Sequence, residues 1–221
     1  NATNAAGGFY AVGGEIVLDN CTVNQKGLHT APYLSMAFAV SSNGKMTINS
    51  GTYSAEPTAA AEGDNQGSTH GSWVGGVMNS GGELIINGGT FKSNNGMINV
   101  SSTVTINGGK FENVVEKTMT RHFAFVSALL TINGGEFYGK ANNSGGGCFF
   151  CGAAAGGDIQ VKGGKFTSLW TSGSVNRIFE SYYGGTITVT GGMFNTNGGI
   201  TNFVVANTDE ATKAQYPYVA K

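Results

Sequence analysis

One short phrase recurs seven times along this chain, at intervals of 20 to 38 residues. The copies begin at residues 16, 46, 84, 104, 130, 159 and 187, and the best preserved reads VTINGGKF. A unit of this size is too short to bury its own apolar face, so its copies must stack on one another to form a core. The repeat therefore predicts a solenoid rather than a globule with one closed core.

The composition limits the organisation and partners of the chain. A repeat that runs without linkers over about residues 9–207 predicts a single domain, 1–221, in which 208–221 form a C-terminal cap or tail. Only 11% of the residues are charged and the net charge is −1, which argues against nucleic acid as a partner. No apolar run approaches the roughly 18 residues of a membrane span, so no membrane insertion is expected. Richness in Asn, Gly, Ser and Thr favours an extracellular or cell-surface location.

Each copy of the phrase predicts two strands joined by a bend. In the best copy, Val104 and Ile106 alternate with polar residues, the period-two pattern of a strand with one buried face. The glycine pair then permits a sharp bend, and the following Phe begins a second strand with its ring directed inward. Another short apolar stretch precedes each copy, as at 123–126. Each turn is therefore expected to contain three strands.

Three strands per turn, each paired with its counterpart about 4.8 Å away in the next turn, describe a parallel β-helix. The preference for right-handed crossovers between parallel strands makes it right-handed. The predicted fold is all-β, a right-handed single-stranded parallel β-helix of about seven to eight turns with three short strands per turn.

This register places equivalent residues of successive turns above one another. It predicts a buried aromatic column, a column of alternating charges and a column of amides at the bend. The aromatic column consists of Val23, Tyr53, Phe91, Phe111, Phe137, Phe166 and Phe194. The charge column consists of Lys110, Glu136 and Lys165, with Lys92 and Glu112 beside it. The amide column consists of Asn87, Asn107 and Asn133. We interpret all three columns as structural ladders rather than as sites.

The recurring (V/I/L)-T-I-N-G-G-x-F phrase resembles the right-handed parallel β-helix repeats of bacterial surface proteins, adhesins and phage fibres, and of the superfamily that includes pectate lyases. The resemblance covers about residues 9–207. It implies the fold but no single activity, because the same scaffold carries lyases, hydrolases and inert stalks.

An active polysaccharide lyase of that superfamily would need carboxylates from adjacent turns that hold Ca²⁺, with an Arg or Lys nearby as base. Glu180 is the one carboxylate in the stretches before the phrase, and Arg177 lies close to it in sequence. These two residues and His122 are the remaining catalytic candidates, although an exposed polar edge with a local ion pair explains them as well. A polygalacturonase-type hydrolase would need clustered aspartates, and the four in the chain lie in different turns. No catalytic motif of the family matches residue by residue, so the sequence favours a non-enzymatic role without a cofactor.

No metal site is predicted. Cys148 and Cys151 form a C-x-x-C sequence, but positions three apart in a strand face opposite sides, so both sulfurs cannot hold one metal ion. His29, His70 and His122 lie in or next to different loops and are expected to be solvated.

Variable insertions follow the Phe of most turns, and insertions in a solenoid fall on one side, which is often the binding side. They are 24–33, 54–71, 92–96, 112–121, 138–147 and 167–176. Aromatic residues in or beside them are the candidate ligand-binding residues, namely Tyr33, Trp73, Tyr138 and Trp170. Aromatic rings among Asn, Ser and Thr suit carbohydrates, which offer apolar faces ringed by hydroxyl groups.

The expected function is therefore an extracellular surface module, adhesive or stalk-like, that binds glycans of a host or cell surface through its loop-bearing side. The alternative is a polysaccharide lyase or hydrolase, the one case in which Ca²⁺ would be expected. A lesser alternative is an ice-binding solenoid, because outward Thr residues such as Thr105 and Thr131 form an interrupted array.

The two ends of the solenoid are expected to differ. An uncovered terminal turn leaves open strand edges and an exposed core. The C-terminal residues can place Tyr216, Pro217, Tyr218 and Val219 against the last turn, whereas the first eight residues offer little apolar cover. The N-terminal edge is therefore expected to continue into further sequence or a partner chain.

Overall fold

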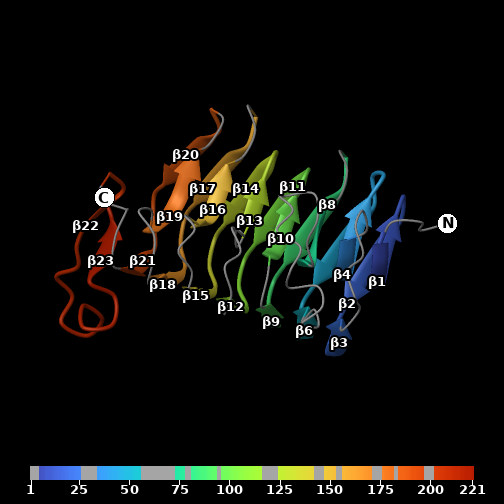
Figure 1. Cartoon of the computed structure of the whole chain (residues 1–221), viewed down its shortest axis with the longest axis horizontal. Helices are drawn as coiled ribbons and strands as arrows, with labels where there is room; N and C mark the ends of the chain where they lie inside the picture. Colours follow the sequence, from blue (N-terminus) through green and yellow to red (C-terminus); the bar gives the residue numbers. More distant parts are fainter. Residues whose placement is uncertain are drawn as a thin grey trace.

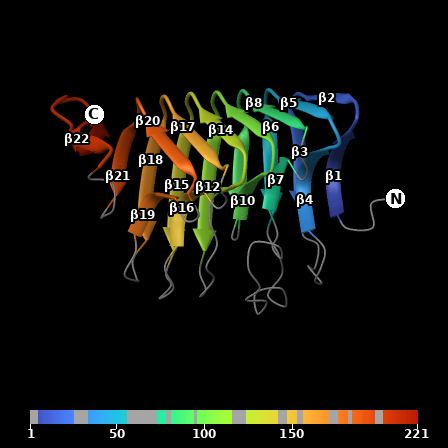
Figure 2. The same ribbon diagram turned by 90° about the horizontal axis from the view of Figure 1, so that it is seen from above.

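The computed structural model describes residues 5–25, 34–55, 73–77, 81–93, 96–115, 124–141, 147–152, 156–170, 176–181, 184–196 and 202–221. Every regular element in these residues is a β-strand. The strands form three sheets that run the length of a rod (Figure 1). Successive coils follow the order of the sequence, so the first coil and the C-terminal strands lie at opposite ends (Figure 2). The predicted all-β parallel β-helix is confirmed.

Each coil contributes one strand to each sheet. Sheet A contains β1 (Ala5–Val12), β4 (Leu34–Ser41), β7 (Trp73–Val77), β10 (Gly96–Val100), β13 (Ala124–Val126), β16 (Gly147–Gly152) and β19 (Asn176–Ser181). Sheet B contains β2 (Glu15–Leu18), β5 (Lys45–Ile48), β8 (Glu83–Ile86), β11 (Thr103–Ile106), β14 (Leu129–Ile132), β17 (Asp158–Val161) and β20 (Thr186–Val189). Sheet C contains β3 (Cys21–Gln25), β6 (Gly51–Ala55), β9 (Thr90–Ser93), β12 (Lys110–Val115), β15 (Glu136–Ala141), β18 (Lys165–Trp170) and β21 (Met193–Thr196), followed by β23 (Tyr218–Ala220) and β22 (Val204–Ala206).

The first half of the repeated phrase builds sheet B. Val104 and Ile106 are at most 1% exposed and alternate with half-buried Thr residues, as the period-two pattern predicts. Neighbouring strands of the sheet are all parallel, and equivalent positions face each other, such as Thr105 and Thr131. The predicted register is therefore the observed one.

The two glycines of the phrase are needed for different reasons. A Cβ on Gly108 would lie 2.7 Å from the Asn87 carbonyl oxygen of the preceding coil. Gly109 has a φ of +107°, which side-chain-bearing residues rarely adopt. The same two constraints recur at 88–89, 134–135, 163–164 and 191–192. Successive coils can therefore stack at this bend because neither position carries a side chain.

The predicted aromatic column is the centre of the core. From Tyr53 through Phe91, Phe111, Phe137 and Phe166 to Phe194, the rings are at most 2% exposed. Neighbouring rings are stacked, with centroids 4.6 to 5.3 Å apart. Burial of each ring contributes about 2 to 3 kcal/mol, and each stacked pair adds about 0.5 to 1.5 kcal/mol. The column therefore makes a large apolar contribution to the stability of the rod.

Tyr53 is the one member of this column that can ionise within the pH range of a folding experiment. Its ring is fully buried, and its hydroxyl donates a 3.0 Å hydrogen bond to the Ser50 carbonyl oxygen. Burial, with smaller contributions from Cys21 and Asp19, raises the pKa of Tyr53 from about 10 to about 12.

This shift predicts a loss of stability in alkali that depends on Tyr53. Because the folded state holds the proton more tightly, the stabilisation is complete below pH 10 and is lost between about pH 10 and pH 12. Over that interval the wild type should lose on the order of 2 kcal/mol relative to Tyr53→Phe. Urea unfolding of both proteins from pH 9 to 12 measures the difference, and a constant difference would contradict the prediction.

The amides at the bend form the predicted ladder. Each Nδ2 donates to the Oδ1 of the preceding coil, from Asn87 to Asn49, from Asn107 to Asn87 and from Asn133 to Asn107, at 2.7 to 2.8 Å. Asn49 joins the ladder although 38 residues separate it from Asn87. An insertion between coils therefore leaves the register of the bend unchanged.

Removal of one rung should destabilise the rod measurably. Asn107→Ala deletes two ladder hydrogen bonds, so its free energy of unfolding should fall by about 1 to 2 kcal/mol. Asn24→Ala is the control, because Asn24 is an exposed strand Asn outside the ladder. Equal losses in the two variants, measured by urea unfolding, would mean that the ladder adds nothing.

The two ends of the rod differ. β23 pairs antiparallel with both β21 and β22, and Tyr216 is only 7% exposed. β22 and β23 extend sheet C, whereas Ile187 and Val189 in the last strand of sheet B stay half-buried. In the first coil, Val12 and Val17 are more than half exposed. Continuation of the N-terminal edge into further sequence or a partner chain stays a prediction.

Candidate functional site

Two of the three catalytic candidates from the sequence lie in one strand, and their catalytic role stays a prediction. Arg177 and Glu180 both belong to β19, opposite Cys148 and Cys151 of β16. His122 lies outside the described residues.

The C-x-x-C sequence lies on a strand, as predicted. Cys148 and Cys151 are both in β16, three residues apart in an extended backbone. Among the residues that the structure describes, no group of three or more His, Cys, Asp or Glu could hold a metal ion.

Three of the four ligand-binding candidates lie in strands rather than in loops. Tyr138 is in β15 and Trp170 ends β18. The insertions predicted at 138–147 and 167–176 therefore start inside these strands, and the strands end later than predicted from the sequence. The reason is that β15 pairs over six residues with both β12 and β18, which extends sheet C well beyond the Phe column. Trp73 begins β7, just after the longest insertion, and Tyr33 falls outside the described residues.

Much of sheet A has no solvent-accessible face in the described coils. Every residue from 36 to 41 in β4 is at most 2% exposed, and residues 74–77 of β7 are buried as well. Because alternate residues of a strand lie on opposite faces, both faces of these strands are removed from solvent. A ligand cannot reach sheet A there.

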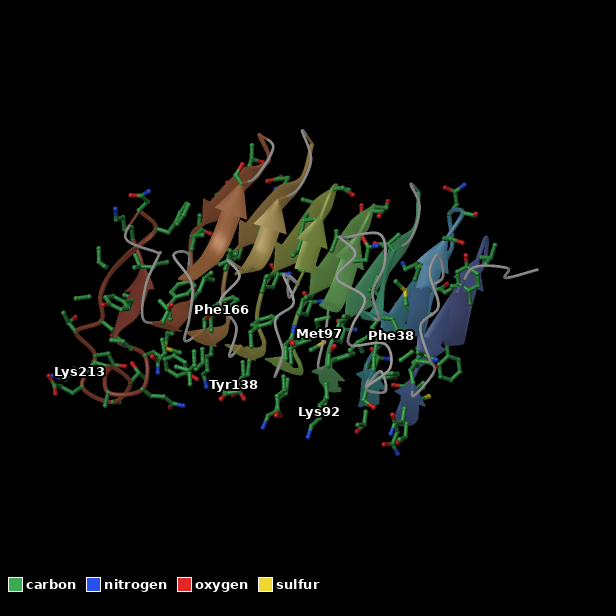
Figure 3. All side chains as sticks on the ribbon, in the orientation of Figure 1. Phe38, Lys92, Met97, Tyr138, Phe166 and Lys213 are labelled. Carbon is green, nitrogen blue, oxygen red and sulfur yellow. The ribbon has the colours of Figure 1, made fainter. Side chains whose placement is uncertain are left out.

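Sheet C instead presents side chains to solvent along the rod. We call its outward residues the sheet C face. They are Thr90 and Lys92 in β9, Lys110 and Glu112 in β12, Glu136 and Tyr138 in β15, Lys165 and Thr167 in β18, and Met193 and Asn195 in β21. In Figure 3, Lys92 and Tyr138 extend from the ribbon on the same side. Tyr138 is half-buried between Glu112 and Thr167, and Leu169 is 37% exposed near it.

The charges on the sheet C face are paired along the axis, as predicted. The Glu136 carboxylate lies 3.8 Å from Lys110 Nζ and 3.4 Å from Lys165 Nζ, and Glu112 lies 3.9 Å from Lys92 Nζ. All five side chains are at least 43% exposed, so each pair contributes at most about 1 kcal/mol. These contacts therefore determine the charge of the surface more than its stability.

The sequence also contained a charge pair that we did not predict, between Lys45 and Glu83 at 3.4 Å on sheet B. Both residues come directly before the repeated phrase, in consecutive coils. The same register argument that paired Lys110 with Glu136 would have found it.

A shallow groove runs beside the sheet C face. It has a volume of about 750 Å³ and crosses six coils, from Gly51 to Met193. The glycine pairs form its floor, and Thr90, Lys110, Glu136 and Lys165 line one side. We call it the glycine groove. Sequence reasoning missed it, although glycine at one point of every turn after the first leaves a line along the rod without side chains.

No segment that the structure describes is a helix with the length and apolar character to cross a membrane. Comparison with known proteins adds no relative to these observations: no family model, curated protein or solved structure matches the chain significantly. The site must therefore be judged from its own geometry.

Proposed function

We propose that the protein is a module of an extracellular surface protein, adhesive or stalk-like, that binds glycans on its loop-bearing side. The observation that carries the proposal is the sheet C face, where Tyr138 lies on β15 between the Glu112 carboxylate and the Thr167 hydroxyl of the neighbouring strands. On this surface a half-buried aromatic side chain lies beside exposed charged groups.

The scaffold suits a surface module. Backbone pairing in three sheets, the aromatic column and the amide ladder each connect one coil to the next without interruption at the insertions. A rod held together in this way keeps its outward residues at fixed spacing. It can therefore hold a binding face at a distance from a cell surface, as a stalk or adhesin does.

The chemistry of the sheet C face suits carbohydrate. A half-buried Tyr offers an apolar ring and a hydroxyl to one ligand, which matches the apolar face and hydroxyl rim of a sugar. Glu112 and Thr167 on either side supply an acceptor and a hydroxyl group. No described contact favours the lyase or hydrolase alternative or its Ca²⁺, and Ile85 and Gln160 interrupt the outward Thr column of the ice-binding alternative.

Loss of the Tyr138 ring should weaken glycan binding without loss of the fold. An immobilised glycan array identifies a bound sugar, and calorimetry then compares Tyr138→Ala with the wild type. A central aromatic contact predicts an affinity reduced by about tenfold to thirtyfold.

The control for this experiment is Tyr10→Ala, since Tyr10 is 41% exposed on β1 in sheet A, at the first coil. Tyr10→Ala should bind as the wild type does. Equal affinity in the wild type and Tyr138→Ala would remove Tyr138 from the site, and no binding by the wild type on the array would leave a spacer without a glycan ligand.

A further inference from the structure

The shape of the sheet C face restricts the direction of a bound chain. β9 and β21 have only two outward positions each, so the face is narrow along the strands. Across the strands, the face extends over five coils and the glycine groove over six, which for the groove is about 24 Å at the spacing of parallel strands. A ligand longer than two sugars therefore gains contacts only if it runs along the axis of the rod.

We propose that the glycine groove and the adjoining sheet C face take an uncharged linear polysaccharide, lying along the axis of the solenoid. This inference rests on the proposed function and names its ligand class. It depends on the side chains of the face, since the groove alone supplies space but no recognition.

The charges of the face disfavour a polyanion. Glu136 is shared by Lys110 and Lys165, and Glu112 is paired with Lys92, so each of the three ammonium groups already has a carboxylate partner and the five groups together carry a charge of only +1. A uronate polymer would have to compete with these carboxylates for the lysines and would be repelled by them. Sugar hydroxyls can donate to a paired carboxylate and accept from a paired ammonium group without breaking either pair.

The amide ladder adds uncharged partners along the same line. Asn87 and Asn107 directly precede the glycine pairs of the groove, and each uses one N–H and one lone pair of its amide within the ladder. A side-chain amide has two N–H donors and further acceptor capacity. Over the four coils from Asn49 to Asn133, the ladder therefore repeats a donor and an acceptor from one coil to the next, which suits a repeating polyhydroxyl chain better than a single small ligand.

The test uses the intact protein and two oligosaccharide series of matched length, neutral oligogalactosides and oligogalacturonates. Affinity for the neutral series should rise from the disaccharide to about five or six sugars, the span of the six coils, and should change little with salt. The wild type should bind the uronates at least about tenfold more weakly at equal length.

A charge variant tests the selectivity directly. Glu112→Gln with Glu136→Gln leaves three lysines without carboxylates and should gain about tenfold in uronate affinity at low salt, a gain that disappears near 1 M salt. Glu83→Gln is the matched control, because its pair with Lys45 lies on sheet B. It should gain no uronate affinity.

The outcomes separate this inference from the proposed function. Affinity that stops rising at the disaccharide, uronate binding by the wild type that equals or exceeds neutral binding, or an equal gain in Glu83→Gln would overturn the inference while glycan binding stands. Absence of binding to either series and to the array would overturn both.

Discussion

The close approach of successive coils at the glycine bend is the constraint on which the rest of the structure depends. At Gly108 even one added carbon would lie 2.7 Å from the Asn87 carbonyl oxygen of the coil beneath. Because the backbone can pass so near, the strands on both sides of the bend pair at their normal spacing and the rings of the core stack. The glycine pair thus serves to set the register between coils and not to make the bend flexible.

Because of the register, equivalent residues of the sequence repeat stack into columns along the rod. The environment of each column determines which residue types can occupy it. Inward positions must fill the same space in every coil, so the column from Phe91 to Phe194 keeps one residue type. The outward column beside it runs through Lys92, Glu112, Tyr138, Thr167 and Asn195. Packing does not dictate those residues, so their variety is available for recognition.

The features that could be predicted from the sequence are those that depend on register alone. The Phe column, the Asn ladder and the Lys110–Glu136 pair follow once the copies of the phrase are aligned. The length of the sheet C strands could not be predicted in this way, because residues beyond the Phe differ between coils and pair through their backbones. Tyr138 and Trp170 were consequently assigned to loops. The glycine groove escaped notice because it consists of missing side chains, which no residue pattern for a site describes.

The same reasoning locates specificity on the rod. A ligand that touched only the repeated residues would meet the same groups at every coil and could slide along the axis without a preferred position. Tyr138 is the one aromatic residue in its outward column, with Glu112 and Thr167 as its neighbours. A repeating chain bound along the groove would therefore gain affinity from the repeated amides and obtain its position from Tyr138. Recognition by a solenoid of this kind requires two features. A periodic surface binds the polymer, and one residue that is not repeated determines where along the rod the polymer lies.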